Sequence, residues 1–291
     1  KDYIDRPFEK NELLIALKSL QRNKSPGDDG LTTEFYLFFW EKLSSLYMKC
    51  LAEIKEIKKL SASQQRGLII IAYKKNGREY LKFYRPITLL NVDVKILTKT
   101  IATRIANRIQ YLINESQTCM PGRHAFKNIH ILQDLIEKIN SSDEEAAILF
   151  LDQEKAFDRI SHNFMFKTLK HFGFGDEIIE WIRLIYKDSV ARVKVDGFLT
   201  PLFPIERGVR QGCPLSSLLY VLCAEVLSVT IKKSTNIVGY KYQNKEHKDM
   251  SFADDLSLVI RKLSSIEPVF SLLNRYCLLY TSDAADEEAS G

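Results

Sequence analysis

The sequence lacks the features that would place it in a membrane or outside the cell. No uninterrupted apolar run reaches the roughly 18 residues of a transmembrane helix, and the opening stretch KDYIDRPFEKNE is too polar for a secretory signal. No CxxC motif and no paired spacing occur among its five cysteines, which are Cys50, Cys119, Cys213, Cys223 and Cys277. These absences argue against a zinc site and a disulfide framework, and they favour an intracellular protein with no membrane partner.

The composition is that of an ordinary globular protein. Of 291 residues, 45% are hydrophobic and 27% are charged, which is enough apolar material for one large domain or two modest ones. The net charge of +5 is unevenly spread. Residues 60–127 contain 12 basic and 3 acidic residues, a local charge of +9, and the remainder carries −4. A basic block on a slightly acidic body suggests an anionic partner such as nucleic acid or nucleotide phosphates, although a merely soluble basic surface is the alternative.

Hydrophobic periodicity predicts an α+β fold. We expect helices at 9–21, 33–58, 92–113, 125–140, 161–172, 176–187, 214–233 and 264–275. Strand signals occur at 67–73, 146–151, 189–196, 202–206, 238–243 and 248–260. Residues 74–86 form a basic loop or hairpin with an Asn-Gly turn signal. The basic residues of 92–113 (Lys95, Lys99, Arg104 and Arg108) are interpreted as a solvated helix face that could meet template phosphates.

Two adjacent carboxylates interrupt an apolar run at MSFADDLSLVI, residues 250–260. The flanking alternation predicts a hairpin with Asp254 and Asp255 at its turn. Asp is a common turn residue, so a turn alone is the simpler interpretation. Two neighbouring anions repel each other and lose hydration in a half-buried site. The other interpretation is therefore that the pair binds a positively charged partner that offsets both costs.

Asp152 supplies a third carboxylate, 102 residues before Asp254, at the end of the apolar run AAILFL, which we interpret as a buried strand. An unpaired charge is costly in such a place. Two Mg²⁺ ions would supply the missing positive charge, because Mg²⁺ takes oxygen ligands and is held by carboxylates together with substrate phosphates. Ions about 3.5–4 Å apart assist an in-line displacement at phosphorus. The three residues therefore predict a nucleotidyl-transfer site.

Five sequence blocks around these residues resemble reverse transcriptases. RPITLLN (85–91), LDQEKAFDRI (151–160), RQGCPLS (210–216) and FADD (252–255) occur in the order and at the spacings of that family. NKSPGDDGLTTEFY (23–36) is similar to the additional upstream block of non-LTR, LINE-type retrotransposon enzymes. The resemblance covers about residues 8–275. It implies an RNA-directed DNA polymerase with a right-hand fold, fingers at 1–145 and palm at 146–275.

The resemblance also implies roles for single residues. Asp152, Asp254 and Asp255 match the metal-binding triad, with Asp254 the more direct ligand of the pair and Asp255 in support. The backbone carbonyl of Gln153 would face a metal, and the cofactor is a pair of Mg²⁺ ions, with Mn²⁺ as a substitute. Phe157 matches the aromatic gate that excludes a 2′-hydroxyl, although a core Phe is the alternative. The residues matched to nucleotide binding are Lys74, Arg85, Gln211 and Gly212, and Lys95 and Lys99 are assigned to the template.

The implied partners are an RNA template, a DNA primer and dNTPs. The resemblance implies a nuclear location during retrotransposition and a cytoplasmic ribonucleoprotein. Endonuclease and thumb regions of the same polyprotein are absent from this sequence, so we expect the chain to be weakly active or inactive. QTCMPGR (117–123) is about one residue shorter than the family pattern. CLLYTSDAADE (277–287) reads like a translated sequencing adapter, so we expect residues 277–291 to be a non-native or disordered tail.

Two alternatives stay open. A group II intron-type reverse transcriptase or maturase shares the palm motifs, but NKSPGDDGL together with LDQEKAFDRI favours the LINE-type branch. A non-catalytic RNA-binding relic of the fold is the other, and the intact Asp triad argues against it. An RNA polymerase with a similar palm is disfavoured by Phe157, because such an enzyme must admit the 2′-hydroxyl.

Overall fold

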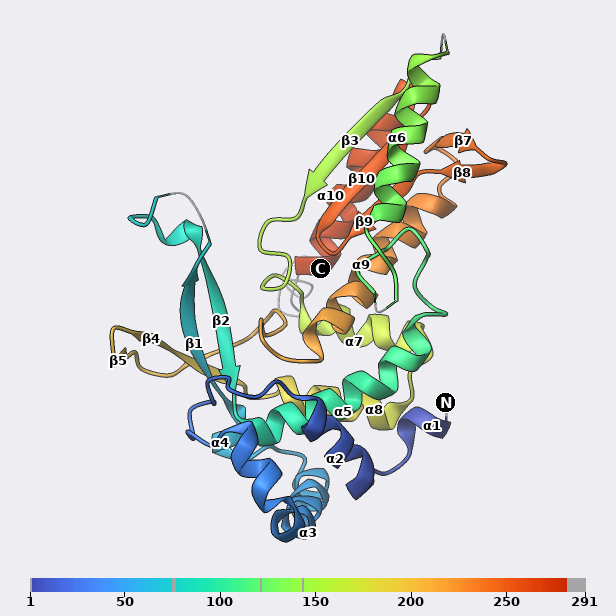
Figure 1. The fold of residues 1–291 in the computed structure, drawn as a ribbon. Coiled ribbons are helices and arrows are strands. Elements are labelled where there is room, and N and C mark those ends of the chain that lie inside the picture. Colours follow the sequence, from blue (N-terminus) through green and yellow to red (C-terminus); the bar gives the residue numbers. More distant parts are fainter. Residues whose placement is uncertain (1, 75–76, 121, 143, 282–291) are drawn as a thin grey trace, which may run out of the picture. The chain divides into compact units, whose positions relative to one another are not determined.

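The computed structural model describes residues 2–74, 77–120, 122–142 and 144–281, which form two compact units (Figure 1). Unit 1 comprises residues 1–107 and 169–218, and unit 2 comprises residues 108–168 and 219–291. The chain therefore passes between the units three times. Each passage lies within a helix: α5 (Val92–Ile109), α7 (His162–His171) and α9 (Ser216–Lys233).

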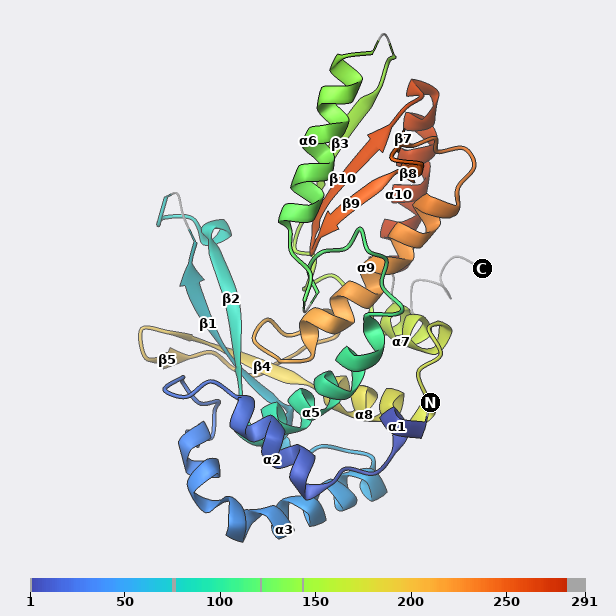
Figure 2. The ribbon, with the colours of Figure 1, turned by 45° about the vertical axis from the view of Figure 1, so that its right-hand side comes forward.

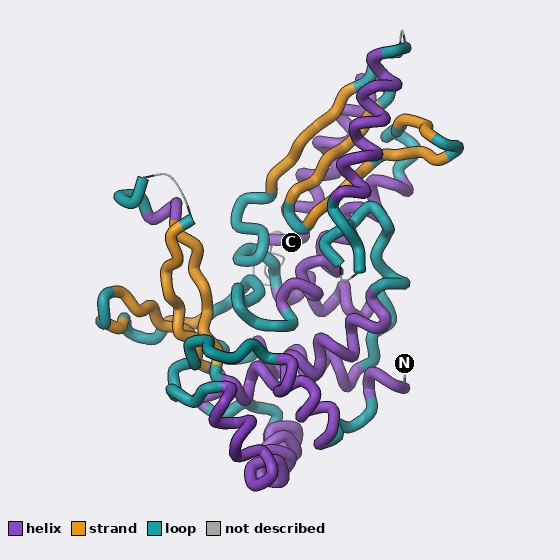
Figure 3. Tube along the Cα trace, viewed as in Figure 1, coloured by secondary structure: helices purple, strands orange, loops and turns teal. Residues whose placement is uncertain are grey.

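Unit 1 is a group of helices with a five-stranded sheet. The helices are α1 (Asp2–Asp5), α2 (Lys10–Ser19), α3 (Thr33–Ile57), α4 (Ala62–Gln65), α8 (Asp176–Tyr186) and most of α5. The strands are β1 (Arg66–Tyr73), β2 (Tyr84–Leu90), β4 (Val190–Val195), β5 (Phe198–Leu199) and β6 (Phe203–Pro204). Their order is β2-β1-β4-β5, with β6 also paired to β4. The β1–β2 ribbon projects from the helical part of this unit (Figure 3).

The pairing within this sheet combines local and distant strands. β1 pairs with β2 in antiparallel register, from Gly67 opposite Leu90 to Tyr73 opposite Tyr84. A short 3₁₀ turn, η1 (Leu81–Phe83), precedes β2. β1 also pairs in parallel with β4, which follows more than a hundred residues later. The sequence predicts β1 and β4 but interprets part of β2 as a basic loop, and Asn76 of the expected Asn-Gly turn lies outside the described residues.

Helix α5 is the buried centre of unit 1. Its apolar positions at helical spacing, such as Ile101 and Ile105, are fully buried, as the periodicity predicts. The prediction of a solvated basic face is wrong for Arg104, which is only 3% exposed. Its guanidinium donates to the carboxylate of Glu12 and to the backbone carbonyls of Ile4, Arg6 and Pro7. Arg104 therefore anchors the N-terminal segment rather than an external phosphate.

Unit 2 contains a three-stranded antiparallel sheet in the order β3-β10-β9. Its strands are β3 (Ala147–Asp152), β9 (Asp249–Phe252) and β10 (Asp255–Ile260), and a separate hairpin pairs β7 (Tyr240–Tyr242) with β8 (Lys245–His247). Helix α6 (Phe126–Asn140) lies over one face of the sheet, and α10 (Ile266–Thr281), after the short turn η2 (Leu263–Ser265), lies over the other (Figure 2). The sequence predicts a small antiparallel sheet backed by helices, and the structure has such a sheet with one of these helices on each face.

The end of α10 corrects one prediction. Residues 277–281, the first part of the tail expected to be non-native or disordered, are helical and continue α10 to Thr281. Tyr280 is fully buried, its hydroxyl donates to the carbonyl of Ala156 at 2.6 Å, and its own carbonyl accepts from the Ser161 amide at 2.8 Å. Burial and these two bonds give this stretch a place in the core that its composition does not indicate. Residues 282–291 lie outside the described part of the chain. Among the described helices, none has the length and apolar character to cross a membrane.

Candidate active site

The register of the small sheet brings the three predicted aspartates together. Asp152 ends β3 and lies directly opposite Asp255, the first residue of β10. Asp254 precedes Asp255 in the turn that joins β9 to β10. Directly opposed residues on antiparallel strands project from the same face, with Cβ atoms about 4.5–5.5 Å apart. Three carboxylates from two distant segments thus share one end of the sheet.

That end of the sheet is open to solvent, contrary to the buried strand that AAILFL suggests. Asp152 and Asp255 are exposed, Asp254 is half-buried and Phe150 is 70% exposed. Alternation places Phe150 on the same face as Asp152. Helix α6 covers only the further part of this face, where Met250 and Val259 are buried in one cluster with Leu135. The face beside the aspartates is therefore exposed in the described part of unit 2.

The turn that carries Asp254 has a constrained backbone. Its two central residues are Ala253 and Asp254, because Phe252 pairs with Asp255. Ala253 has φ of +52°, whereas Asp254 has negative φ. This combination of signs is that of a type II′ turn, a common two-residue hairpin connection in which glycine is usual at the first central position. A non-glycine residue there is strained and needs support from its surroundings.

The three aspartates provide the carboxylate oxygens that a magnesium site needs, but their side chains do not form a compact ligand cluster. Among the described residues, no group of three or more His, Cys, Asp or Glu side chains lies close enough to hold a metal ion. The oxygen donors of the three aspartates and their shared end of the sheet fit Mg²⁺, which binds through a few carboxylates and keeps water or phosphate ligands.

Phe157 lies in the same unit, in the turns that follow β3. Its half-buried ring stacks on Tyr220 of α9, with centroids 4.8 Å apart and planes inclined by 12°. The hydroxyl of Tyr220 donates to the side chain of Gln153 at 3.1 Å. Burial raises the pKa of Tyr220 well above its ordinary value, and the nearby charge of Asp254 adds to the effect. Tyr220, which no sequence motif indicated, thus links Phe157, Gln153 and the neighbourhood of the aspartates.

Gln211 and Gly212 lie against strand β2 in unit 1. The carbonyl of Gln211 accepts from the Thr88 amide at 2.7 Å. Gly212 has φ of +111°, and a Cβ atom there would stand 2.6 Å from the carbonyl oxygen of Thr88. The resemblance to reverse transcriptases implies a role for Gly212 in nucleotide binding. The structure supplies a requirement within the fold, because only a residue without Cβ can approach this strand so closely.

Lys74 and Arg85 share one face of the β1–β2 ribbon in unit 1. Arg85 lies opposite Ala72, and the Lys74 amide donates to the Phe83 carbonyl at 2.9 Å. Side chains alternate between the two faces of a strand, so Lys74 projects from the same face as Ala72. Arg85 is paired with Ala72 and therefore projects from that face as well. Both cations are exposed. The described basic residues near this end of the ribbon also include Arg78 and Lys82, so much of the accessible positive charge of residues 60–127 gathers here.

Lys95 and Lys99 on α5 are half-buried rather than fully solvated. Burial lowers the pKa of Lys95, and the neighbouring charge of Asp29 opposes that effect. Lys95 therefore lies near an acidic group of its own unit. The negative charge of that group weakens the attraction between Lys95 and a template phosphate. The predicted template contact of Lys99 stays a prediction.

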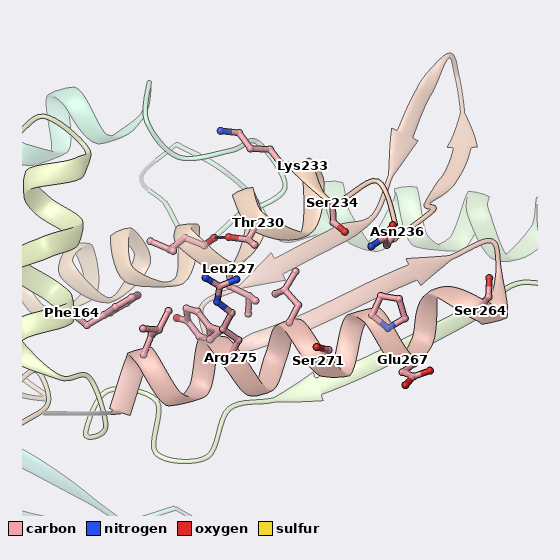
Figure 4. A pocket seen from close by; sticks show the side chains of 15 residues that line it. Phe164, Leu227, Thr230, Lys233, Ser234, Asn236, Ser264, Glu267, Ser271 and Arg275 are labelled. Atoms are coloured by element: carbon pink, nitrogen blue, oxygen red, sulfur yellow. Dashed lines mark hydrogen bonds between the residues drawn. The ribbon is translucent and has the colours of Figure 1, made fainter. Parts of the chain in front are cut away.

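A cavity of about 890 Å³ lies apart from all these residues. It opens between α9 and α10 of unit 2, where Arg275 extends from α10 toward Leu227 (Figure 4). Its lining combines apolar side chains such as Phe164 with isolated polar ones, and none of the predicted site residues contributes to it.

The described fold, with its aspartate-bearing hairpin, is that of a nucleic-acid polymerase. It resembles telomerase from Candida tropicalis in complex with a fragment of telomeric RNA, at a TM-score of 0.52 and 14% identity. The alignment covers 86% of this chain and 43% of that one. The apo telomerase from the same organism matches equally well, at a TM-score of 0.52 over 84% of this chain and 47% of that one.

The chain belongs to the reverse transcriptase (RNA-dependent DNA polymerase) family, whose model matches residues 73–281. It is 34% identical over 268 residues to the transposon TX1 uncharacterized 149 kDa protein of Xenopus laevis, across 92% of this chain and 20% of that protein. It is 26% identical over 236 residues to the Pol polyprotein of retrotransposable element R2DM of Drosophila melanogaster, across 81% and 22%. The chain thus spans about one fifth of these relatives, and the predicted relation to non-LTR retrotransposon reverse transcriptases is confirmed.

Proposed function

We propose that this chain carries the polymerising site of a non-LTR retrotransposon reverse transcriptase. It would add dNTPs to a primer 3′-hydroxyl on an RNA or DNA template. The observation that carries the proposal is the register of the small sheet, which sets Asp152 opposite Asp255, the residue after Asp254, at an exposed end of the sheet. Nucleotidyl transfer asks a protein mainly for positioning and charge stabilisation, and this arrangement offers both.

Asp152 and Asp254 would hold two Mg²⁺ ions, with Asp255 and the backbone carbonyl of Gln153 in support. The family generally uses a divalent metal, and Mn²⁺ could replace Mg²⁺ at oxygen ligands. When bound, a pair of such ions activates the attacking hydroxyl and neutralises charge on the leaving phosphate oxygen. The contribution of the chain is to keep both strand ends in register, so that Asp152 and Asp255 lie at the same end of the sheet.

The other predicted residues would select and hold the nucleotide. The ring of Phe157 would lie under the sugar, and its stacking on Tyr220 supports it in a fixed orientation. Lys74 and Arg85 would bind the triphosphate from one face of the β1–β2 ribbon, Arg85 through its planar charge-assisted fork. Gln211 and Gly212 would contact the nucleotide from the loop that β2 holds in place.

We propose fingers at residues 1–145 and palm at residues 146–275 as the functional subdivision. The partners would be an RNA template, a DNA primer and dNTPs, in a cytoplasmic ribonucleoprotein that acts in the nucleus. Endonuclease and thumb functions would belong to other parts of a polyprotein, in keeping with the fraction of its relatives that this chain spans.

Single-nucleotide addition with enzyme in excess over an RNA-templated DNA primer tests the proposal, because one addition needs no processivity. We expect incorporation of dNTP with Mg²⁺. The Asp152→Asn variant should lose it at least a hundredfold, since the change removes a metal-binding charge but keeps the shape. Glu137→Gln, an equal change on the exposed face of α6, is the control and should keep parental activity. Parental addition by folded Asp152→Asn would refute the assignment.

The Phe157→Ala variant provides a second arm of that experiment. Removal of the ring opens space for the 2′-hydroxyl, so the ratio of rNTP to dNTP efficiency should rise at least tenfold. Phe270→Ala, at a half-exposed position on α10, should leave the ratio unchanged. An unchanged ratio in Phe157→Ala with dNTP use retained would make Phe157 a packing residue only.

A further inference from the structure

The turn that carries Asp254 is held from outside its own hairpin by Gln117. The side-chain oxygen of Gln117 accepts from the Ala253 amide at 3.1 Å, and its side-chain nitrogen lies 3.5 Å from the Ala253 carbonyl, to which it donates. The same oxygen also accepts from the Cys119 amide at 3.0 Å. One side-chain amide thus satisfies both backbone groups of the residue directly before Asp254.

These backbone groups need such a partner. Ala253 is the first central residue of a two-residue turn, so its N–H and C=O have no partner in the β9–β10 ladder. Its positive φ of +52° is unfavourable for alanine and persists only where the surroundings hold it. A rotation about the backbone bonds of Ala253 would change the direction in which Asp254 projects from the turn. The position of the candidate metal ligand therefore depends on what holds Ala253.

Gln117 is itself fixed by its surroundings. It is 2% exposed, and its backbone runs beside β9 as an additional short edge. The Ser251 amide donates to Ser116 and the Thr118 amide donates to Ser251, both at 2.9 Å. The guanidinium of Arg123 donates to the Gln117 carbonyl at 2.9 Å and to three other carbonyls of the preceding loop. The amide is thus presented to the turn by a rigid support.

We infer that Gln117 is a positioning residue for the polymerising site: it holds Ala253 in the turn conformation that presents Asp254 to the metal. The inference rests on the proposed function for the identity of the ligand. It predicts a graded weakening of metal binding rather than loss of the fold, because every carboxylate remains when Gln117 is replaced.

Binding of Mn²⁺ alone, followed by the electron paramagnetic resonance signal of the free ion, tests the inference on the folded chain. Gln117→Leu removes all three bonds and should weaken Mn²⁺ binding at least fivefold. Asn128→Leu is the matched control. Asn128 donates to Ser116 and Ser251 of the same support but not to Ala253, so its replacement should keep Mn²⁺ affinity within twofold. Equal losses in the two variants, or parental affinity in Gln117→Leu, would overturn the inference.

Hydrogen exchange of the Ala253 amide gives a readout that does not depend on metal. Exchange should accelerate at least tenfold in Gln117→Leu and stay near parental in Asn128→Leu. If Gln117→Leu does not fold, Gln117→Glu replaces it, because a carboxylate still accepts from the Ala253 amide and should preserve slow exchange. Fast exchange in folded Gln117→Glu would contradict the inference. If Asp254→Asn binds Mn²⁺ as the parent does, the metal site of the proposed function fails, and exchange at Ala253 still decides the role of Gln117.

Discussion

Gly212 shows how a motif residue can serve the fold and the reaction together. A Cβ atom at this position would meet the Thr88 carbonyl at 2.6 Å, and φ of +111° is unfavourable for any other residue. Gly212→Ala should therefore lower the free energy of unfolding by about 2–4 kcal/mol, from backbone strain plus overpacking. Urea denaturation measures the loss.

Gly30→Ala is the matched control for that substitution. Gly30 also has positive φ, at +74°, but nothing lies within 4 Å of its added Cβ. Its replacement should cost only the left-handed backbone penalty of about 1–2 kcal/mol. If both variants lose the same stability, the close approach of Gly212 to β2 contributes nothing and only its φ matters.

For single side chains, the sequence indicates the groups that carry charge but not the groups that hold them. Asp152, Asp254 and Asp255 attract attention in the sequence because acids in an apolar run are costly, and the structure pairs Asp152 with Asp255. Tyr220 and Gln117 could not be predicted, since their importance comes from contacts across 67 and 136 positions. The one available signal for Gln117 was its position at the start of the QTCMPGR segment.

At the scale of elements, the β1–β2 ribbon sets two exposed cations on one face. If Arg85 binds the triphosphate, Arg85→Ala should raise the apparent KM for dNTP about 10–100-fold, since a charge-assisted hydrogen bond contributes about 1.5–3 kcal/mol. The affinity for primer-template should change less than threefold. Steady-state kinetics and fluorescence anisotropy measure the two quantities. Arg78→Ala, which removes an exposed cation near the end of the same ribbon, is the control. A fall in duplex affinity with unchanged KM would assign Arg85 to the template path.

Helix α9 carries an acid that should make stability depend on pH. Glu225 is 2% exposed and accepts from the Asn114 amide at 3.0 Å. Burial raises its pKa to about 7, and the charge of Asp249 adds to this, while Lys232 and Arg123 oppose it. A raised pKa means that the folded state holds a proton which the unfolded state has released. Stability is then highest below the ordinary pKa of glutamate and falls as pH rises toward 7.

Glu225→Gln removes that dependence, because glutamine is neutral at every pH and can still accept from Asn114. We subtract the free energy of unfolding of the parent from that of the variant at each pH. This difference should be roughly 2 kcal/mol larger at pH 8 than at pH 5. Urea denaturation at the two pH values measures the difference. Glu137→Gln on exposed α6 should show no such change. A pH-independent difference for Glu225→Gln would mean that Glu225 is ionised in the folded state.

Elements with strong periodicity were predictable, and elements defined by distant partners were not. Helices α3, α6 and α8 begin and end within a residue or two of the expected ranges. Strand β2 was interpreted partly as a loop, because YRPITLL mixes a basic residue and proline with its apolar positions and is held by β1. The last turn of α10 was missed because its burial against Ala156 and Ser161 cannot be read from composition.

At the scale of the molecule, each compact unit is assembled from two separate stretches of chain. Division at 145/146, the proposed boundary of fingers and palm, would separate β1 from β4 and the 116–118 edge from β9. We therefore expect neither 1–145 nor 146–281 alone to unfold cooperatively, whereas the two pieces expressed together should recover a cooperative transition. Thermal unfolding followed by circular dichroism is the measurement. Independent cooperative folding of either piece would show that the long-range pairings are dispensable.

The parallel pairing of β1 with β4 also has a consequence for the order of events during synthesis. Between the end of β1 at Tyr73 and the start of β4 at Val190, more than a hundred residues must be translated. At roughly 5–20 residues per second, this takes on the order of 6–23 s. Throughout that interval, one edge of the apolar strand RGLIIIAY has no partner and can pair with another nascent chain. Slower translation would lengthen this exposure, so the yield of soluble protein should depend on codon choice between these strands more than after β4.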